Sequence, residues 1–168
     1  MTETSSNLTQ PDQPMVVITR LFNAPRELVF QAWTDPEQLL RWYAPPGCTI
    51  RFRTLDVRPG GAYHSCIQTP DGHHCWCSGS YREIVAPERI VYSMAISDEH
   101  GHLLTATEAG MDPAWPRETM VTVTFADRGG RTELTLRQTV LESLAKRTGA
   151  HPSWLLMLDR LEEQLGTK

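Results

Sequence analysis

Along the chain, the spacing of apolar residues changes between the alternation of a strand and the three- to four-residue spacing of a helix. These changes predict the order of the strands and helices. Residues 15–22, MVVITRLF, are rich in β-branched side chains, which is typical of a strand. Two short helices are expected next: Asn23 is interpreted as a cap ahead of Pro25, and Asp35 as the N-cap before Pro36. Apolar residues at helical spacing are expected to be buried in these helices: Leu28, Val29, Ala32, Trp33, Leu39, Leu40, Trp42 and Tyr43.

From Thr49 to Gln138 the period becomes two, which predicts six antiparallel strands joined by tight turns. In the first of these strands the alternation favours burial of Ile50, Phe52, Leu55 and Val57. Residues 98–117 interrupt the pattern without any periodicity of their own. We expect them to form either a lid-like loop or an irregular excursion.

The chain ends with a pattern that predicts a long amphipathic helix. Its apolar residues lie three and four positions apart, opposite a charged face: Trp154, Leu155, Leu158, Leu161 and Leu165. A weaker helical turn is expected over residues 143–147, before Gly149. One antiparallel sheet and one amphipathic helix bury their apolar faces by packing as two layers. The predicted fold class is therefore α+β, with the helix across the concave face of the sheet.

The hairpin around Pro70–Asp71–Gly72 predicts which side chains share a face of the sheet. A type I turn followed by Gly72 in the left-handed region makes a bulged three-residue loop, which pairs Thr69 with His73 and Ile67 with Cys75. Side-chain alternation then places one set of residues on the expected cavity wall: Tyr63, Ser65, Ile67, His73, Cys75, Cys77 and Tyr81. The opposite face carries His64, Cys66 and Trp76, and Trp76 needs cover or a partner.

Histidine and cysteine side chains gather in this hairpin, and they are ligand types that zinc prefers. The expected register divides them between the two faces, and no second cysteine pair follows at zinc-ribbon spacing. A two-residue turn would instead bring His64, Cys66, Cys75 and Cys77 together, so the register decides. We expect no metal and no cofactor. Cysteine nucleophiles are conceivable, but small thiols packing a cavity wall are the favoured interpretation.

Composition and charge narrow the function classes. Sixteen basic and 20 acidic residues leave a net charge of -4, which argues against a nucleic-acid partner. Because the chain contains no apolar run of 18 residues, we expect no membrane span. Residues 1–14 are polar and aperiodic, which predicts a disordered tail without the features of a secretory signal. We therefore expect one domain over residues 15–168, a cytoplasmic location and free thiols.

The order and spacing of these segments resemble the SRPBCC superfamily of START-like, helix-grip proteins. The branch they resemble is homologous to the C-terminal domain of the activator of the heat-shock-protein-90 ATPase. The resemblance rests on FNAPRELVFQAWTDPEQLLRWYAPPG, DVRPGGAYH, PDGHHCWCSGSYREIVAPERIVYS, AGMDPAWPRETMVTVTFADRGGRTELTLRQ and SWLLMLDRLEEQL, which span residues 22–165. It implies a β-α-α-β6-α order, a sheet curved around the C-terminal helix and a cavity between them, but no single chemistry.

The resemblance and the residues together favour a protein, either monomer or homodimer, that binds a small apolar or aromatic ligand without catalysis. Expected ligand-binding residues are Trp42, Tyr43, Tyr63, Ile67, Cys75, Cys77, Tyr81, Tyr92, Trp154 and Leu158. These aromatic residues are equally compatible with an ordinary core. Two other functions stay open: a cyclase- or aromatase-like enzyme that uses the same cavity, and a co-chaperone-like interaction module.

Overall fold

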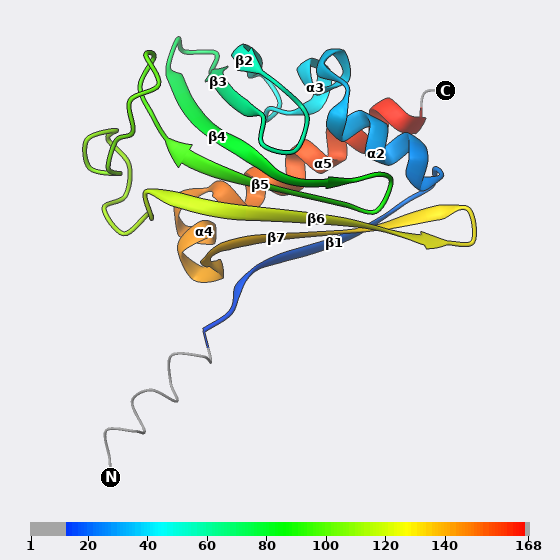
Figure 1. Cartoon of the computed structure of the whole chain (residues 1–168). Helices are drawn as coiled ribbons and strands as arrows, with labels where there is room; N and C mark the ends of the chain where they lie inside the picture. The colour runs from blue at the N-terminus through cyan, green and yellow to red at the C-terminus, as the bar shows by residue number, and fades with distance from the viewer. Residues whose placement is uncertain (1–12, 167–168) are drawn as a thin grey trace.

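One curved sheet of seven antiparallel strands dominates the computed structural model, which describes residues 13–166 (Figure 1). The strands lie in the order β1-β7-β6-β5-β4-β3-β2, so β1 and β2 form its two edges. Their bounds are β1 Met15–Phe22, β2 Thr49–Leu55, β3 Ala62–Gln68, β4 His74–Val85, β5 Arg89–Ile96, β6 Glu118–Arg128 and β7 Arg131–Leu141. The expected tail lies mostly outside the described residues.

Among residues 13–166, four helices cover the concave side of this sheet: α2 (Arg26–Thr34), α3 (Pro36–Trp42), α4 (Glu142–Thr148) and α5 (Ala150–Gly166). The long helix α5 runs along the sheet, α2 and α3 lie at one end, and α4 lies at the other end beside the loop of residues 98–117 (Figure 1). The predicted α+β helix-grip class is confirmed. The weak turn expected after β7 is helix α4, and Gly149 follows it with a left-handed φ of 92°.

The two short helices begin in different ways. Asp35 caps α3 as predicted: its side chain accepts a hydrogen bond from the backbone N–H of Glu37 at 3.0 Å. The predicted cap of α2 is wrong. Pro25 itself occupies the N-cap position, and no side chain caps this helix. Its extended backbone lets the carbonyl of Pro25 accept from the N–H groups of Leu28 and Val29, so Asn23 lies too far upstream to cap.

The buried faces differ from the predicted ones at several positions. Leu28 and Leu40 were expected in the core but are 40% and 50% exposed. In α2 the buried face is rotated toward Phe30, which packs edge-on against Phe125 at 5.3 Å between ring centroids. In α5, Met157 is buried although it was not predicted to be, whereas Leu155 and Leu165 are only half-buried. Three residues in or after the edge strand β2 were also predicted to be buried and are only half-buried: Phe52, Leu55 and Val57.

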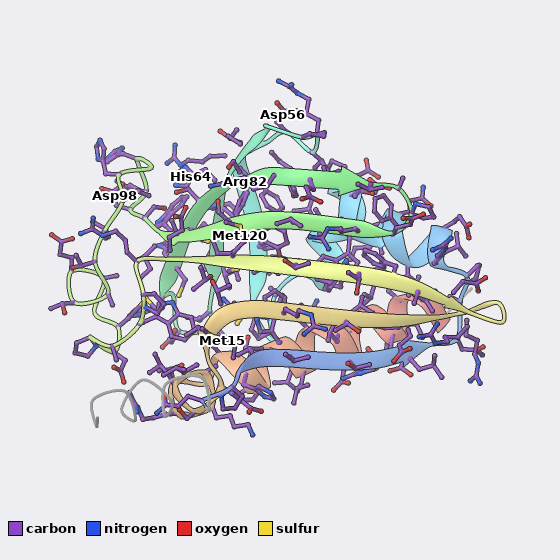
Figure 2. The ribbon with its side chains drawn as sticks, turned by 60° about the horizontal axis from the view of Figure 1, so that its bottom comes forward. Met15, Asp56, His64, Arg82, Asp98 and Met120 are labelled. Carbon is purple, nitrogen blue, oxygen red and sulfur yellow. The ribbon has the colours of Figure 1, made fainter. Side chains whose placement is uncertain are left out.

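The hairpin between β3 and β4 has the predicted register. Ile67 lies opposite Cys75, Ser65 lies opposite Cys77, and Gly72 has a φ of 89°. Cys66 and Trp76 therefore face the outer side of the sheet, which Figure 2 turns toward the viewer with His64, Arg82 and Met120 labelled. The half-buried Trp76 is covered by its own neighbours: the His64 ring, 5.0 Å away between centroids, and the guanidinium groups of Arg51 and Arg53.

A close backbone approach lies in the middle of β4. An added Cβ on Gly79 would lie 2.0 Å from the carbonyl oxygen of Ser93, so no side chain fits there. The same carbonyl accepts a hydrogen bond from the Tyr63 hydroxyl at 2.7 Å. The Ser93 hydroxyl accepts from the backbone N–H of Ser80 at 3.0 Å. Gly79 thus fixes how β4 and β5 meet beneath Tyr63.

Candidate functional site

A hollow region lies between the sheet, the first turns of α5 and the loop of residues 98–117. It consists of two adjoining cavities of about 220 Å³ and about 150 Å³. Both are lined by Ile67, Met94, Trp115 and Gln138, so we treat them as one space, called the chamber. The walls of the chamber also include Ser65, Cys75, Cys77, Ile96, Met111, Thr119, Ala150, Ser153, Trp154 and Met157.

Gln138 is the polar group at the centre of the chamber. Its side chain extends inward from β7 and is only 3% exposed. The indole N–H of Trp154 can only donate, so the atom it meets at 2.9 Å is the amide oxygen of Gln138. The amide nitrogen then donates to Thr119 Oγ1 at 3.0 Å. The orientation of the amide is therefore fixed by its two neighbours.

The loop of residues 98–117 covers the chamber with Met111 and Trp115. The carboxylate of Asp112 pairs with Arg147 of α4 at 3.1 Å, which holds this part of the loop against the fold. A second, outward-facing groove of about 520 Å³ lies along the same loop. The groove meets the chamber at the residues that line both spaces, which are Cys75, Trp76, Ile96 and Met111.

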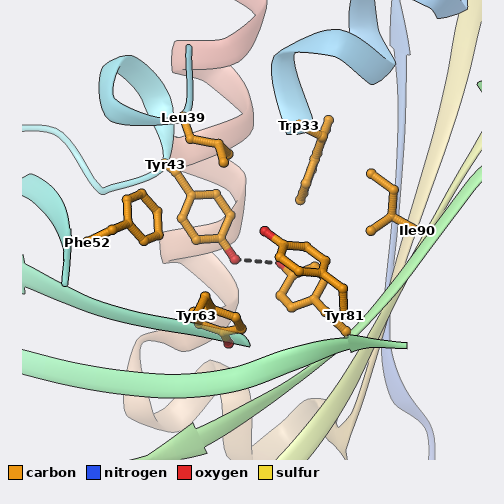
Figure 3. Close-up of a pocket in the computed structure, with 8 residues that line it drawn as sticks. Trp33, Leu39, Tyr43, Phe52, Tyr63, Tyr81 and Ile90 are labelled. Atoms are coloured by element: carbon orange, nitrogen blue, oxygen red, sulfur yellow. Dashed lines mark hydrogen bonds between the residues drawn. The ribbon is translucent and has the colours of Figure 1, made fainter. Parts of the chain in front are cut away.

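All four tyrosines of the chain lie at the other end of the concave face (Figure 3). Together with Trp33, Leu39, Phe52 and Ile90, they surround a cavity of only about 20 Å³; we call this region the tyrosine cluster. The hydroxyl groups of Tyr43 and Tyr92 share a hydrogen bond of 2.5 Å. The space left between these rings is enough for about one water molecule.

Tyr63 and Cys77 separate the two regions. Tyr63 lines the tyrosine cluster, Cys77 lines the chamber, and the hydroxyl oxygen of Tyr63 lies 3.6 Å from the sulfur of Cys77. Tyr43 borders both regions. The concave face is therefore divided into a packed part and a hollow part by contacts between neighbouring side chains.

The chamber and the tyrosine cluster are electrically neutral at pH 7. Within residues 13–166, no lysine, arginine, aspartate, glutamate or histidine lines either region. Burial raises the pKa of the Cys77 thiol to about 11 and that of the Tyr81 hydroxyl to about 12. Burial also raises the pKa of Tyr63 and Tyr92. These groups keep their protons at neutral pH, so Cys77 offers no thiolate nucleophile.

The structure distributes the expected ligand-binding residues over three places. Five border the chamber: Tyr43, Ile67, Cys75, Cys77 and Trp154. Three belong to the tyrosine cluster alone: Tyr63, Tyr81 and Tyr92. Trp42 and Leu158 are fully buried in the core and line neither region. The indole N–H of Trp42 donates to the backbone oxygen of Ala32 at 2.9 Å, so its polar atom is used within the helical layer.

Sequence reasoning missed the residues that give the chamber its character: Met94, Met111, Trp115, Thr119, Gln138 and Met157. One signal was available for Gln138. Leu134, Leu136 and Val140 alternate inward along β7, and Gln138 is the polar residue at the next inward position between them. No comparable signal marks Trp115, because its loop has no period.

The cysteines and histidines do not converge. Within residues 13–166, no group of three or more His, Cys, Asp or Glu side chains is placed to hold a metal ion. The four cysteines are free thiols: Cys66 is buried on the outer face, Cys77 faces the chamber and Cys75 is exposed. None of the helices described here is long and apolar enough to cross a membrane.

Known structures share this fold over most of its length. A protein from Chromobacterium violaceum is 24% identical, with a TM-score of 0.72, over 89% of this chain and 95% of its own. A protein from Mycobacterium smegmatis is 21% identical, with a TM-score of 0.75, over 93% of both chains. A comparison with curated proteins found no match. The model of one family matches residues 23–166, and the chain therefore belongs to the family described as activator of Hsp90 ATPase homolog 1-like protein.

Proposed function

We propose that the protein binds one small apolar or aromatic molecule in the chamber. The observation that carries this proposal is the hollow itself, which is apolar apart from a few hydrogen-bonding groups. An apolar cavity of about 150 Å³ is large enough to hold benzene. The larger part of the chamber, at about 220 Å³, has room for one or two rings.

The mouth of the chamber lies where the chamber meets the outer groove, beside Cys75, Ile96 and Met111. A ligand entering there passes beneath the loop of residues 98–117, which acts as the gate. Met111 is 41% exposed, which suits a side chain at an entrance. The loop is tied down by Asp112, so opening it means breaking the exposed ion pair with Arg147.

Binding without catalysis is favoured by the chemistry of the walls. The described residues that line the chamber supply no carboxylate or imidazole for acid–base work, and the thiol of Cys77 is held in its neutral form. The tyrosine hydroxyls that a cyclase-like reaction would use border a space too small for a substrate, apart from that of Tyr43. A cytoplasmic location and a monomeric or homodimeric state complete the proposal.

Native mass spectrometry of the protein purified from its own host tests this proposal. We expect a co-purifying small molecule, released on unfolding. A calorimetric titration with naphthalene tests the chamber directly, with Ile67→Phe as the variant that fills it and Val17→Phe, an exposed position on β1, as the matched control. Binding that is lost in Ile67→Phe and kept in Val17→Phe supports the proposal. Equal binding to both variants places the ligand elsewhere.

A further inference from the structure

We propose that the ligand is an uncharged aromatic molecule with one hydroxyl or carbonyl oxygen, and that this oxygen accepts hydrogen bonds from Gln138 and Thr119. The inference rests on the proposed function and deepens it by naming the class of ligand. Three properties of the chamber carry it: two hydrogen-bond donors at one point with weak or missing partners, the neutrality of the walls and the kind of side chains that surround the space.

The donors converge at the amide of Gln138. One of its two amide protons goes to Thr119, and the other faces only the sulfur of Met94, with 3.9 Å between nitrogen and sulfur. A thioether is a weak acceptor, so an oxygen arriving there makes the better bond. Thr119 accepts from Gln138, and its own hydroxyl proton has no acceptor among residues 13–166. A ligand oxygen at this point can accept from both groups.

The cost of burying polar groups explains why this arrangement points to a ligand. Gln138 and Thr119 are each only 3% exposed. Donors that are withdrawn from water and left with weak or missing partners destabilise a fold, whereas a matching acceptor removes that penalty. The amide oxygen of Gln138 is needed by the indole N–H of Trp154, but its second amide proton and the hydroxyl proton of Thr119 gain no good acceptor from the protein itself. The polar pair is therefore useful when something with an acceptor occupies the chamber.

Neutral walls exclude charged ligands. The described residues lining the chamber offer no cation to pair with a carboxylate or phosphate, and no carboxylate to pair with an ammonium group. The raised pKa of the Cys77 thiol means that it does not supply a negative charge either. An ionic ligand would lose its hydration and gain no counter-charge, which makes its burial strongly unfavourable.

Soft and flat side chains surround the rest of the space. Met94, Met111 and Met157 line the chamber together with Trp115 and Trp154. Thioether sulfur makes favourable contacts with aromatic rings, and indole rings stack or pack edge-on against them. A ligand of one or two aromatic rings fits both the volume and these surfaces.

Three naphthalene derivatives separate the parts of this inference by calorimetry at pH 7. Naphthalene has no acceptor oxygen, 1-naphthol adds a neutral hydroxyl, and 1-naphthoate adds a charge. We expect the unaltered protein to bind 1-naphthol about tenfold more tightly than naphthalene, and 1-naphthoate at least about tenfold more weakly than naphthalene.

Two variants assign the preference to the polar pair. Thr119→Val keeps the shape of the side chain and removes the hydroxyl, and Gln138→Met removes the amide. In each, the ratio of 1-naphthol to naphthalene affinity should fall to about three, because one of the two donors remains, while naphthalene binding changes less than about threefold. Thr124→Val is the matched control, because Thr124 lies on the same strand with its side chain on the outer face. It should keep the tenfold ratio.

The outcomes distinguish this inference from the function on which it rests. Equal binding of naphthalene and 1-naphthol to the unaltered protein overturns the polar anchor, as does a tenfold ratio that survives in both variants. Tight binding of 1-naphthoate overturns the claim of neutrality. Each of these results leaves the chamber as a binding site. Failure of all three probes to bind contradicts the proposed function itself. If Gln138→Met does not fold, as judged by circular dichroism, Thr119→Val decides alone.

Discussion

The tyrosine cluster and the chamber share strands β3, β4 and β5, yet one is packed and the other is hollow. Along β3, Tyr63 belongs to the cluster and Ile67 to the chamber; along β5, Tyr92 belongs to the cluster and Met94 to the chamber. The cover differs as well. Helices α2 and α3 place Trp33 and Tyr43 over the cluster, whereas a loop and the first turns of α5 cover the chamber. Covering elements and side-chain size, and not the sheet itself, decide where space remains.

Truncations along α5 should show this difference most strongly. Leu158→Ala removes a fully buried side chain from the close-packed core and should lower the free energy of unfolding by about 2–5 kcal/mol. Met157→Ala should cost less, about 1–2 kcal/mol, because this side chain already borders empty space and makes fewer contacts. Chemical denaturation measures both. A loss below about half a kcal/mol for Leu158→Ala would show that α5 is wrongly placed.

Enlarging one side chain at each end tests the same comparison in the opposite direction. Ile90→Phe puts extra volume beside a cavity of about 20 Å³ and should destabilise the fold by about 1–3 kcal/mol. Ile67→Phe enters the chamber and should change stability by less than about 1 kcal/mol. Thermal and urea unfolding compare the pair. Equal penalties would mean that the chamber closes in solution.

Alkaline pH should weaken the fold through the buried thiol and phenol. Unfolded cysteine and tyrosine titrate near 9.0 and 10.0, whereas Cys77 and Tyr81 in the fold titrate near 11 and 12. Above pH 9 the unfolded chain therefore binds fewer protons than the folded one, and the free energy of unfolding falls as pH rises. Full stability is present below pH 9, and each group should remove roughly 1–3 kcal/mol by pH 12.

Variants show which end responds to alkaline pH. Tyr81→Phe and Cys77→Ala should each flatten the decline, as followed by urea denaturation at pH 8 to 12. Val17→Thr, at an exposed position on β1 without a titrating group, is the control and should leave the slope unchanged. A decline that is identical in all four proteins would show that neither Cys77 nor Tyr81 is responsible for it.

Thiol reactivity has the smallest expected effect on stability, because the test uses the unaltered protein and no substitution. Cys75 should react with an aromatic disulfide reagent within about tenfold of the rate of free cysteine, since its side chain is exposed at the mouth. Cys66 and Cys77 should react at least about a hundredfold more slowly. Saturation with 1-naphthol should slow Cys75 and Cys77 and leave Cys66 unaffected. Mass spectrometry of the modified peptides identifies each site, and fast reaction at Cys77 would show that it faces water.

Local rules predicted the fold better than the site. The Gly72 bulge requires a left-handed residue, and from that requirement the Ile67–Cys75 pairing follows directly. By contrast, Tyr81 and Cys77 share one strand face but lie in different regions, because helices distant in sequence fill one end only. Leu28 was misplaced for a related reason: helical spacing defines a stripe, but the rotation of the helix depends on partners such as Phe125.

Gly79 has a consequence for how the interior can diverge between related proteins. Its missing side chain admits the Ser93 carbonyl, which in turn holds the Tyr63 hydroxyl at the partition between the two regions. A side chain at this position would displace the backbone of β5, and the same displacement would break the hydrogen bond between the Tyr63 hydroxyl and the Ser93 carbonyl. A single mutation could therefore join the small cavity to the large one and lengthen the pocket without altering any residue of its floor. Ligand size in descendants of this chain would then be set by a backbone contact that no ligand touches.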